Sequence, residues 1–335
     1  MPELRKDPVV KRWVIIATER AKRPNDFKSA QKKKEENKFC VFCYGNEHLT
    51  PPEILAFRPE DTKPNESGWW VRVVDNKFPA LNYKEDVKRA GHGMYDMMSG
   101  FGKHEVIIET PNHDENLATI PYKQIKEVVW AYVMRYRELS KDPNLKYILI
   151  FKNYKREAGA SLSHPHSQII ATPIVPKRVE EELHGSKQYY DYKERCVFCD
   201  IIQQEKMEKT RIVEENDDFI SFVPYAARFP YEIWILPKRH TSNFGEITDE
   251  EVDSFSKILK DTGAKLINVL GDPPFNYVIH SSPVGNPNLP HYHWHLEIMP
   301  RLTKTAGFEW GSGFYINPVP PEAAAASLNG EPESK

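Results

Sequence analysis

Two histidines stand one residue apart in the segment SHPHSQ (163–168). Alternate residues of a strand share one face, so His164, His166 and Gln168 are expected to point to the same side. Imidazole can bind a metal ion or attack phosphorus, and an amide can donate a hydrogen bond to a phosphoryl oxygen. Pro165 cannot donate to a strand ladder, which predicts an edge, a start or a bulge of a strand. The simpler alternative is a polar strand face turned to water.

The four cysteines lie in two identical tetrapeptides, CVFC at 40–43 and CVFC at 196–199. In a reducing compartment such pairs are more often metal ligands or redox motifs than disulfides. Each pair is followed by two histidines 51 residues apart, His113 and His164 in the first case, His240 and His291 in the second. Two thiolates with two imidazoles make a closed tetrahedral zinc site, which is a structural site. The sequence therefore predicts two structural zinc ions per chain, one on Cys40, Cys43, His113 and His164 and one on Cys196, Cys199, His240 and His291. The alternatives are that one copy has lost its metal or that the thiols are simply buried.

The doubled cysteine pattern extends to the elements around it. Each half has an amphipathic helix after its first histidine, one near 121–140 and one starting at Thr248 with a capping box to Glu251. A strand follows each helix, at 147–151 and at 276–280. The first half carries a surplus between Pro79 and His104 that is typical of a long loop. We expect an N-terminal half at 1–190 with the reactive histidine and a C-terminal half at 191–335 that ends in a disordered tail.

If zinc takes His164, His166 remains available on a strand that the metal holds rigid. Neutral imidazole is a competent nucleophile, and its phosphoramidate passes the phosphoryl group on. Upstream, Gly159 and Ser161 are small enough to let backbone N–H groups approach a phosphate. Gln168 supplies a neutral donor and no proton shuttle for water, which favours a transferase over a hydrolase. His293 and His295 are interpreted as packing or secondary site residues.

Bulk composition excludes several other classes. The 46 basic and 48 acidic residues nearly cancel, so charge indicates no nucleic-acid or membrane partner. We find no apolar stretch of membrane-spanning length and no signal peptide, and we expect a cytoplasmic protein.

Several segments together resemble the galactose-1-phosphate uridylyltransferase family, the transferase branch of the histidine-triad proteins. They are ELRKDPVVKRWVIIATERAKRP (3–24), NKFPAL (76–81), FKNYKREAGASLSHPHSQ (151–168) and GFEWGSGFYIN (307–317). The resemblance implies an α+β fold in which two duplicated histidine-triad-like halves form one mainly antiparallel sheet with helices packed on it. It implies a homodimer whose active sites are completed by the partner's C-terminal segment.

The resemblance also implies roles for individual residues. His166 would take a nucleotidyl group from a nucleoside diphosphate sugar and pass it to a sugar 1-phosphate by ping-pong kinetics. Positions that match the family's substrate contacts are Arg20, Arg23, Asn76, Phe78, Asn153, Gly159, Ser161 and Gln168. Galactose 1-phosphate with UDP-glucose is the leading substrate pair.

Two departures keep a second substrate reading open. Lys77 stands where an aspartate that contacts the ribose is common, and GFEWGSG (307–313) differs from the hexose-binding segment of the best-known members. A related branch, the ADP-glucose phosphorylases, transfers AMP and is the alternative. Glu182 could match a glutamate that binds iron in other members, but CVFC at 196–199 favours zinc. A non-enzymatic double zinc module would explain the cysteines but not His166.

Overall fold

The computed structural model describes residues 1–22, 39–84 and 86–331. Its centre is a ten-stranded sheet with the order β10-β11-β12-β14-β13-β8-β9-β7-β4-β3, and every neighbouring pair in it is antiparallel. The strands of the first half are β3 (Glu53–Phe57), β4 (Val71–Asp75), β7 (Lys103–Ile108), β8 (Tyr147–Tyr154) and β9 (His166–Thr172). Those of the second half are β10 (Ile212–Glu215), β11 (Phe219–Phe222), β12 (Ile233–Pro237), β13 (Phe275–His280) and β14 (His295–Pro300).

The strand order is a palindrome about the β13–β8 pair. From that seam outward, each half runs through the same five positions, with β8 matching β13, β9 matching β14 and β7 matching β12. The helix that precedes β8 also has a counterpart before β13. The duplicated halves and the mainly antiparallel α+β sheet expected from the sequence are therefore confirmed.

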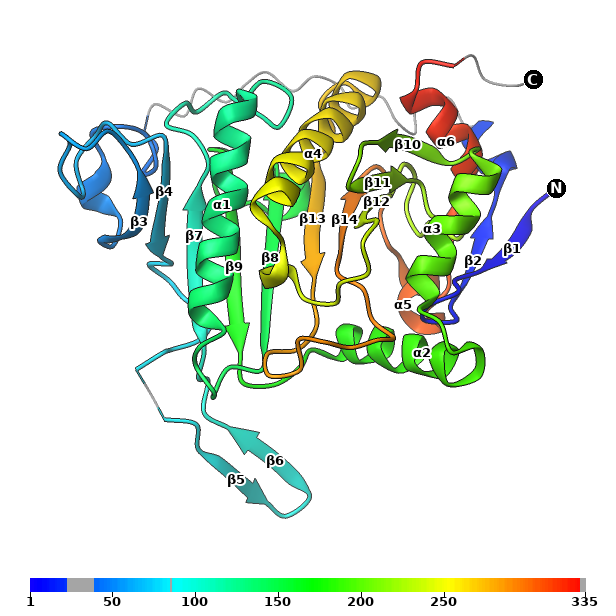
Figure 1. The fold of residues 1–335 in the computed structure, drawn as a ribbon, viewed down its shortest axis with the longest axis horizontal. Helices are drawn as coiled ribbons and strands as arrows, with labels where there is room; N and C mark the ends of the chain where they lie inside the picture. The colour runs from blue at the N-terminus through cyan, green and yellow to red at the C-terminus, as the bar shows by residue number, and fades with distance from the viewer. Residues whose placement is uncertain (23–38, 85, 332–335) are drawn as a thin grey trace.

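Two long helices, α1 (Tyr122–Leu139) and α4 (Asp249–Leu270), cover one face of the sheet side by side (Figure 1). Thr248 and Glu251 form the expected capping box at the start of α4. Odd-numbered residues of β9, Ile169 and Ala171, belong to the main apolar core on this side. His166 and Gln168, one residue out of phase, therefore lie on the opposite face.

The opposite face is covered over the second half. There α2 (Lys177–Lys193), α3 (Val197–Glu208) and the N-terminal segment enclose a second apolar cluster that includes Val9, Phe198 and Trp234. A small sheet joins β1 (Glu3–Lys6) and β2 (Trp13–Ile16) to β15 (Tyr315–Asn317). The remaining helical segments are η1 (Thr18–Lys22), η2 (Glu47–Leu49), η3 (Arg156–Ala158), η4 (Phe244–Glu246), α5 (Gly307–Ser312) and α6 (Pro321–Leu328).

The segment between Pro79 and His104 is not the plain loop that its composition predicted. It contains a two-stranded hairpin of β5 (Arg89–His92) and β6 (Tyr95–Met98), which projects from the body (Figure 1). Glycine at position 93, with φ of 60°, makes the tight reversal at its tip. The residues predicted as a disordered tail are described only to Glu331. Among the described helices, none is long and apolar enough to cross a membrane.

Candidate active site and metal groups

His166 is the first residue of β9, so Pro165 stands just before the strand and costs no ladder hydrogen bond. Ile108 of β7 pairs with it on one side. The ring packs edge-to-face on Phe42, with 5.4 Å between centroids. The side chain is only 7% exposed. The strand and the Phe42 contact together hold the imidazole in one orientation.

The hydrogen bonds of His166 determine which nitrogen can react. Its Nδ1 lies 2.8 Å from the carbonyl oxygen of His164, which can only accept, so Nδ1 carries the proton. Nε2 then keeps its lone pair. Burial lowers the pKa of His166 below its ordinary value, because the charged form is desolvated. The ring is therefore a neutral base with a free Nε2 at neutral pH, as nucleophilic attack requires.

The residues expected to hold phosphates surround this face. Continuing the β8–β9 register places Asn153 opposite His166, and Phe151 pairs with Gln168. Gly159 follows the 3-10 helix η3 with φ of 90°, a left-handed conformation that favours glycine. Ser161 is exposed just after it. The structure thus places the two amides on strand positions next to His166 and the small-residue loop just beyond β8.

The expected nucleotide-pocket residues follow the end of β4. The backbone N–H of Asn76 donates to the carbonyl of His104 in β7, and the side-chain oxygen of Asn76 accepts from the N–H of Phe78. The Phe78 ring is 84% exposed, so it offers an open aromatic face. Arg20 is exposed on η1, at the end of the small sheet. Arg23 lies outside the described residues.

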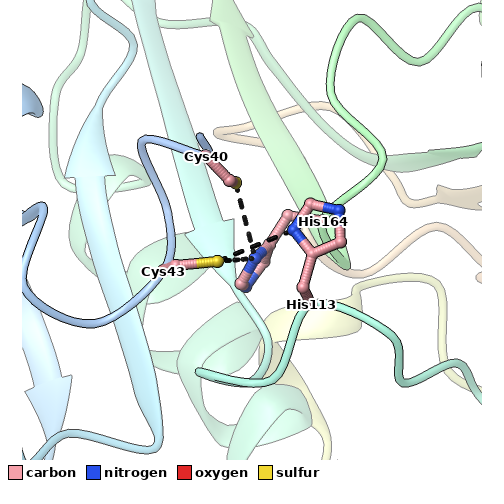
Figure 2. Close-up of side chains that lie close together, drawn as sticks. All are labelled: Cys40, Cys43, His113 and His164. Carbon is pink, nitrogen blue, oxygen red and sulfur yellow. Dashed lines mark hydrogen bonds between the residues drawn. The ribbon is translucent and has the colours of Figure 1, made fainter. Parts of the chain in front are cut away.

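The first metal group is assembled as expected, from the two cysteines of one segment and two histidines from elsewhere in the chain (Figure 2). Nδ1 of His164 lies 3.7 Å from Sγ of Cys40 and 3.6 Å from Sγ of Cys43. Nδ1 of His113 lies 3.6 Å from Sγ of Cys43. A tetrahedral ion bonded to sulfur at ~2.3 Å and to nitrogen at ~2.1 Å would separate them by about 3.6 Å. The spacing therefore fits one metal ion at the centre of the four atoms.

The surroundings of the first group suit metal binding as well. Burial lowers the pKa of His164 to about 4, so the ring is neutral and can offer its lone pair. Its other nitrogen, Nε2, lies 2.6 Å from the carbonyl of Thr110, which fixes the tautomer with Nδ1 facing the cysteines. Nε2 of His113 lies 2.9 Å from the Ser163 hydroxyl in the same way. These residues could hold a metal ion.

The second group contains His293 and not His291, so that part of the sequence prediction is wrong. Its members are Cys196, Cys199, His240 and His293. Nδ1 of His293 lies 3.6 Å from Sγ of Cys199, and its Nε2 lies 2.9 Å from the carbonyl of Pro237, as His164 relates to Cys43 and Thr110. The His291 ring instead lies near Tyr190. The equal spacing of 51 residues was misleading, because the second half has two more residues between its paired histidines.

This shift of two residues also changes which residue of the second half corresponds to His166. His295, at the start of β14, lies 3.0 Å through Nδ1 from the carbonyl of His293, so it and not His293 corresponds to His166. Its ring is 1% exposed and packs on Phe198, with 5.0 Å between centroids, and on Trp234, with 5.4 Å. The counterpart of Gln168 is Glu297, a carboxylate that would repel phosphate. Among the described residues, the histidine that is followed two positions later by an amide is therefore His166, in the first half.

A third group joins Glu182 to two histidines, His280 and His295, that the sequence pattern does not link to it. Nδ1 of His280 lies 2.8 Å from the Glu182 carboxylate, and the Tyr292 hydroxyl donates to the same oxygen at 2.9 Å. His295 stacks on His280, with centroids 4.9 Å apart. These three could also hold a metal ion. The alternation of His293 and His295 was the one sequence signal that pointed to this group. His280 ends a strand 98 residues from Glu182, and only the fold brings these two residues together.

The comparisons with known proteins agree with this architecture. The N-terminal domain pattern of galactose-1-phosphate uridyl transferase matches residues 1–176, and the C-terminal domain pattern matches residues 148–309. The chain belongs to the galactose-1-phosphate uridyl transferase family.

Relatives in this family cover nearly the whole chain. An ADP-glucose phosphorylase of Arabidopsis thaliana is 42% identical over 97% of this chain and 91% of its own length. A galactose-1-phosphate uridylyltransferase of Thermotoga maritima is 36% identical over 98% of each. The solved structure of an Arabidopsis ADP-glucose phosphorylase with bound ADP-glucose superposes with a TM-score of 0.81, at 38% identity over 98% of each chain. A uridylyltransferase structure reaches a TM-score of 0.76, at 32% identity over 98% of each.

Proposed function

We propose that this family member transfers a nucleotidyl group from a nucleoside diphosphate hexose to a hexose 1-phosphate through a covalent intermediate on His166. The free Nε2 of the neutral, buried His166 imidazole, on a strand next to the one that carries Asn153 and two residues before Gln168, is the observation that carries the proposal. UMP from UDP-glucose, with galactose 1-phosphate as acceptor, is the leading assignment. Relatives that bear the uridylyltransferase name support it.

The geometry suggests how each residue acts. Nε2 of His166 attacks the phosphorus next to the nucleoside, the bond from that phosphorus to the departing hexose 1-phosphate oxygen breaks, and an N–P bond forms. The ring retains its Nδ1 proton, and the His164 carbonyl at 2.8 Å stabilises the positive charge that develops on it. The amino groups of Gln168 and Asn153 donate to phosphate oxygens. Attack by the second hexose 1-phosphate reverses these steps and regenerates the free imidazole.

We further propose that the two cysteine–histidine groups hold zinc. Two thiolates and two imidazoles at tetrahedral spacing suit zinc and leave no open position, so the ion supplies rigidity and no chemistry. In the first group this rigidity would fix the His164 carbonyl that orients His166.

A second candidate donor is ADP-glucose, with AMP as the transferred group. The 42% identity to an ADP-glucose phosphorylase and the similarity to a structure with bound ADP-glucose favour it. The chemistry at His166 is the same for both donors, because only the base differs.

Intact-mass spectrometry distinguishes the candidates. The protein is incubated with UDP-glucose and, separately, with ADP-glucose, and galactose 1-phosphate is then added. A mass gain of one UMP that galactose 1-phosphate removes supports the leading assignment. A gain of AMP alone moves the assignment to the second candidate. No adduct with either donor refutes the covalent mechanism.

The assembly and the compartment are also proposals. A homodimer in which α5 (Gly307–Ser312) reaches the partner's site would explain why Phe308 and Trp310 are exposed in the single chain. The four cysteines are free thiols in the structure, and their use as metal ligands suits the reducing cytoplasm. Sedimentation analysis tests the dimer directly.

A further inference from the structure

We propose that His104 and Asn276 are positioning residues that hold the amides of Gln168 and Asn153 with their amino groups turned toward the phosphates. The inference rests on the proposed function and adds two residues to it. His104 lies in β7 and Asn276 in β13, and the strand registers place both on the same sheet face as His166. Neither side chain needs to touch the substrate.

The orientation of Gln168 follows from a chain of hydrogen bonds that begins at the backbone. The N–H of Ala80 donates to Nδ1 of His104 at 3.2 Å, so Nδ1 is bare and Nε2 carries the proton of the neutral ring. That Nε2 lies 2.8 Å from Oε1 of Gln168. The ring proton therefore fixes the Gln168 oxygen, and the Gln168 amino group must point away from His104. His104 is 9% exposed, so water competes little for this bond.

Asn76 does not compete for the Nε2 proton. Its side-chain oxygen accepts from the N–H of Phe78 at 2.9 Å, so the atom that lies 3.1 Å from Nε2 of His104 is its amino nitrogen, and two donors form no hydrogen bond there. The single Nε2 proton needs an acceptor, and of these two amides only Gln168 offers an oxygen to it. The amino groups of Asn76 and Gln168 are thus both left for a ligand.

The orientation of Asn153 is set in the same way from the other side. The amino group of Asn276 donates to the backbone carbonyl of Ala158 at 2.7 Å, which identifies that atom as nitrogen. The same nitrogen lies 2.7 Å from Oδ1 of Asn153. The amino group of Asn153 therefore turns away, and a Cβ built at Gly159 would lie 4.0 Å from it. The amide faces the small-residue loop expected to receive a phosphate.

The two series of hydrogen bonds, through His104 and through Asn276, have the same consequence for a negatively charged phosphate. An amide that can rotate must first be turned with its nitrogen toward the anion, because the anion repels its oxygen. With both oxygens already bonded, the amino groups of Gln168 and Asn153 stay aligned as the phosphate arrives, and no reorganisation is needed. Loss of either positioning residue should therefore slow the chemical step more than it weakens binding.

A double-mutant cycle tests the role of His104. The measured quantity is the single-turnover rate of adduct formation on His166, with UDP-glucose or ADP-glucose as donor. We expect about 10-fold slowing for His104→Asn, which keeps an acceptor near Ala80 but cannot reach Gln168. Gln168→Ala should cost about 100-fold, as loss of one phosphate donor does. In the Gln168→Ala background, His104→Asn should add no further loss, because the group it positions is gone.

Matched variants separate positioning from a general structural role. His104→Gln restores an N–H near the place of Nε2 and should recover most of the rate that His104→Asn loses, with KM changed less than kcat. His92→Asn, on the exposed β5–β6 hairpin, is the control for the same substitution and should match the wild type. Independent losses in the cycle, or a His104→Gln variant as slow as His104→Asn, would overturn the role of His104. The same cycle with Asn276→Asp and Asn153→Ala tests the role of Asn276, and independent losses in that cycle would overturn it.

A spectroscopic measurement keeps this inference distinct from the proposed function. Nitrogen NMR of the labelled holoprotein should show the His104 ring protonated at Nε2 and bare at Nδ1. Protonation at Nδ1 would refute the orientation of Gln168 whatever the activity. A wild-type protein with the Nε2 tautomer but no adduct from either donor would instead support the orientation and refute the proposed function.

Discussion

Replacement of His166 by glycine should separate catalysis from folding. The imidazole makes one hydrogen bond, to the His164 carbonyl, and its loss costs about 1 kcal/mol. Glycine in a strand costs about 1 kcal/mol more, and loss of the ring contact with Phe42 costs about another 1 kcal/mol. The sum of about 3 kcal/mol is below the usual stability of a folded domain, so the variant should fold. The first metal group should stay intact, because His164 faces its cysteines through Nδ1 and Thr110 through Nε2.

The expected effect of this variant on turnover is far larger. The neighbouring amides of Gln168 and Asn153 are not nucleophiles at neutral pH, so the covalent route is lost. We expect kcat to fall by at least about 10⁴-fold, which corresponds to about 5.4 kcal/mol in the barrier. Steady-state transfer assays and metal analysis on the same preparation make the test. Transfer at close to the wild-type rate would refute the covalent mechanism, whereas loss of metal together with activity would refute the separation of the two roles.

Three further perturbations have defined outcomes. His293→Ala should remove one metal equivalent per chain by elemental analysis, whereas His291→Ala should remove none; the reverse result would contradict the ligand assignment. Because burial lowers the pKa of His166, its neutral form persists to lower pH. The midpoint of the acid limb in the pH profile of kcat/KM should therefore lie below pH 6.5, the ordinary histidine value, and a midpoint at or above 6.5 would show a solvated ring. Burial alone would raise the pKa of Glu297, but Arg228 and the buried histidines lower it to about 2. The ionised carboxylate therefore stabilises the fold above about pH 4.5, and this contribution is lost as the pH falls toward 2. Arg228→Met should cost about 3–5 kcal/mol in urea unfolding at pH 7 and less at pH 5, and a cost that does not shrink with acid would argue against an unpaired carboxylate as the cause.

The sequence was most informative where chemistry repeats at fixed spacing. The paired cysteines, the two long helices and the start of β9 just after Pro165 all lie where pattern and composition predicted them. These features depend on local rules, namely helical periodicity, capping and the missing proline donor. The family's segments then tied them to one architecture.

The sequence was least informative where two strands or halves meet. His291 was predicted in place of His293 as a member of the second metal group, because spacing along the chain does not record two extra residues in a loop between equivalent positions. The hairpin β5–β6 escaped notice because a Gly- and Met-rich stretch lacks strand periodicity. The contacts His104–Gln168 and Asn276–Asn153 join residues 64 and 123 positions apart, and only strand register brings them together.

The seam between β8 and β13 limits how small this enzyme can be made. Residues 1–176 alone would expose β8 as an unpaired edge, which invites aggregation. The same cut would remove Asn276, although His166 and the first metal group would remain complete. The C-terminal half therefore supplies both the strand that covers β8 and the contact to Asn153, and truncation to the N-terminal half would lose the two together.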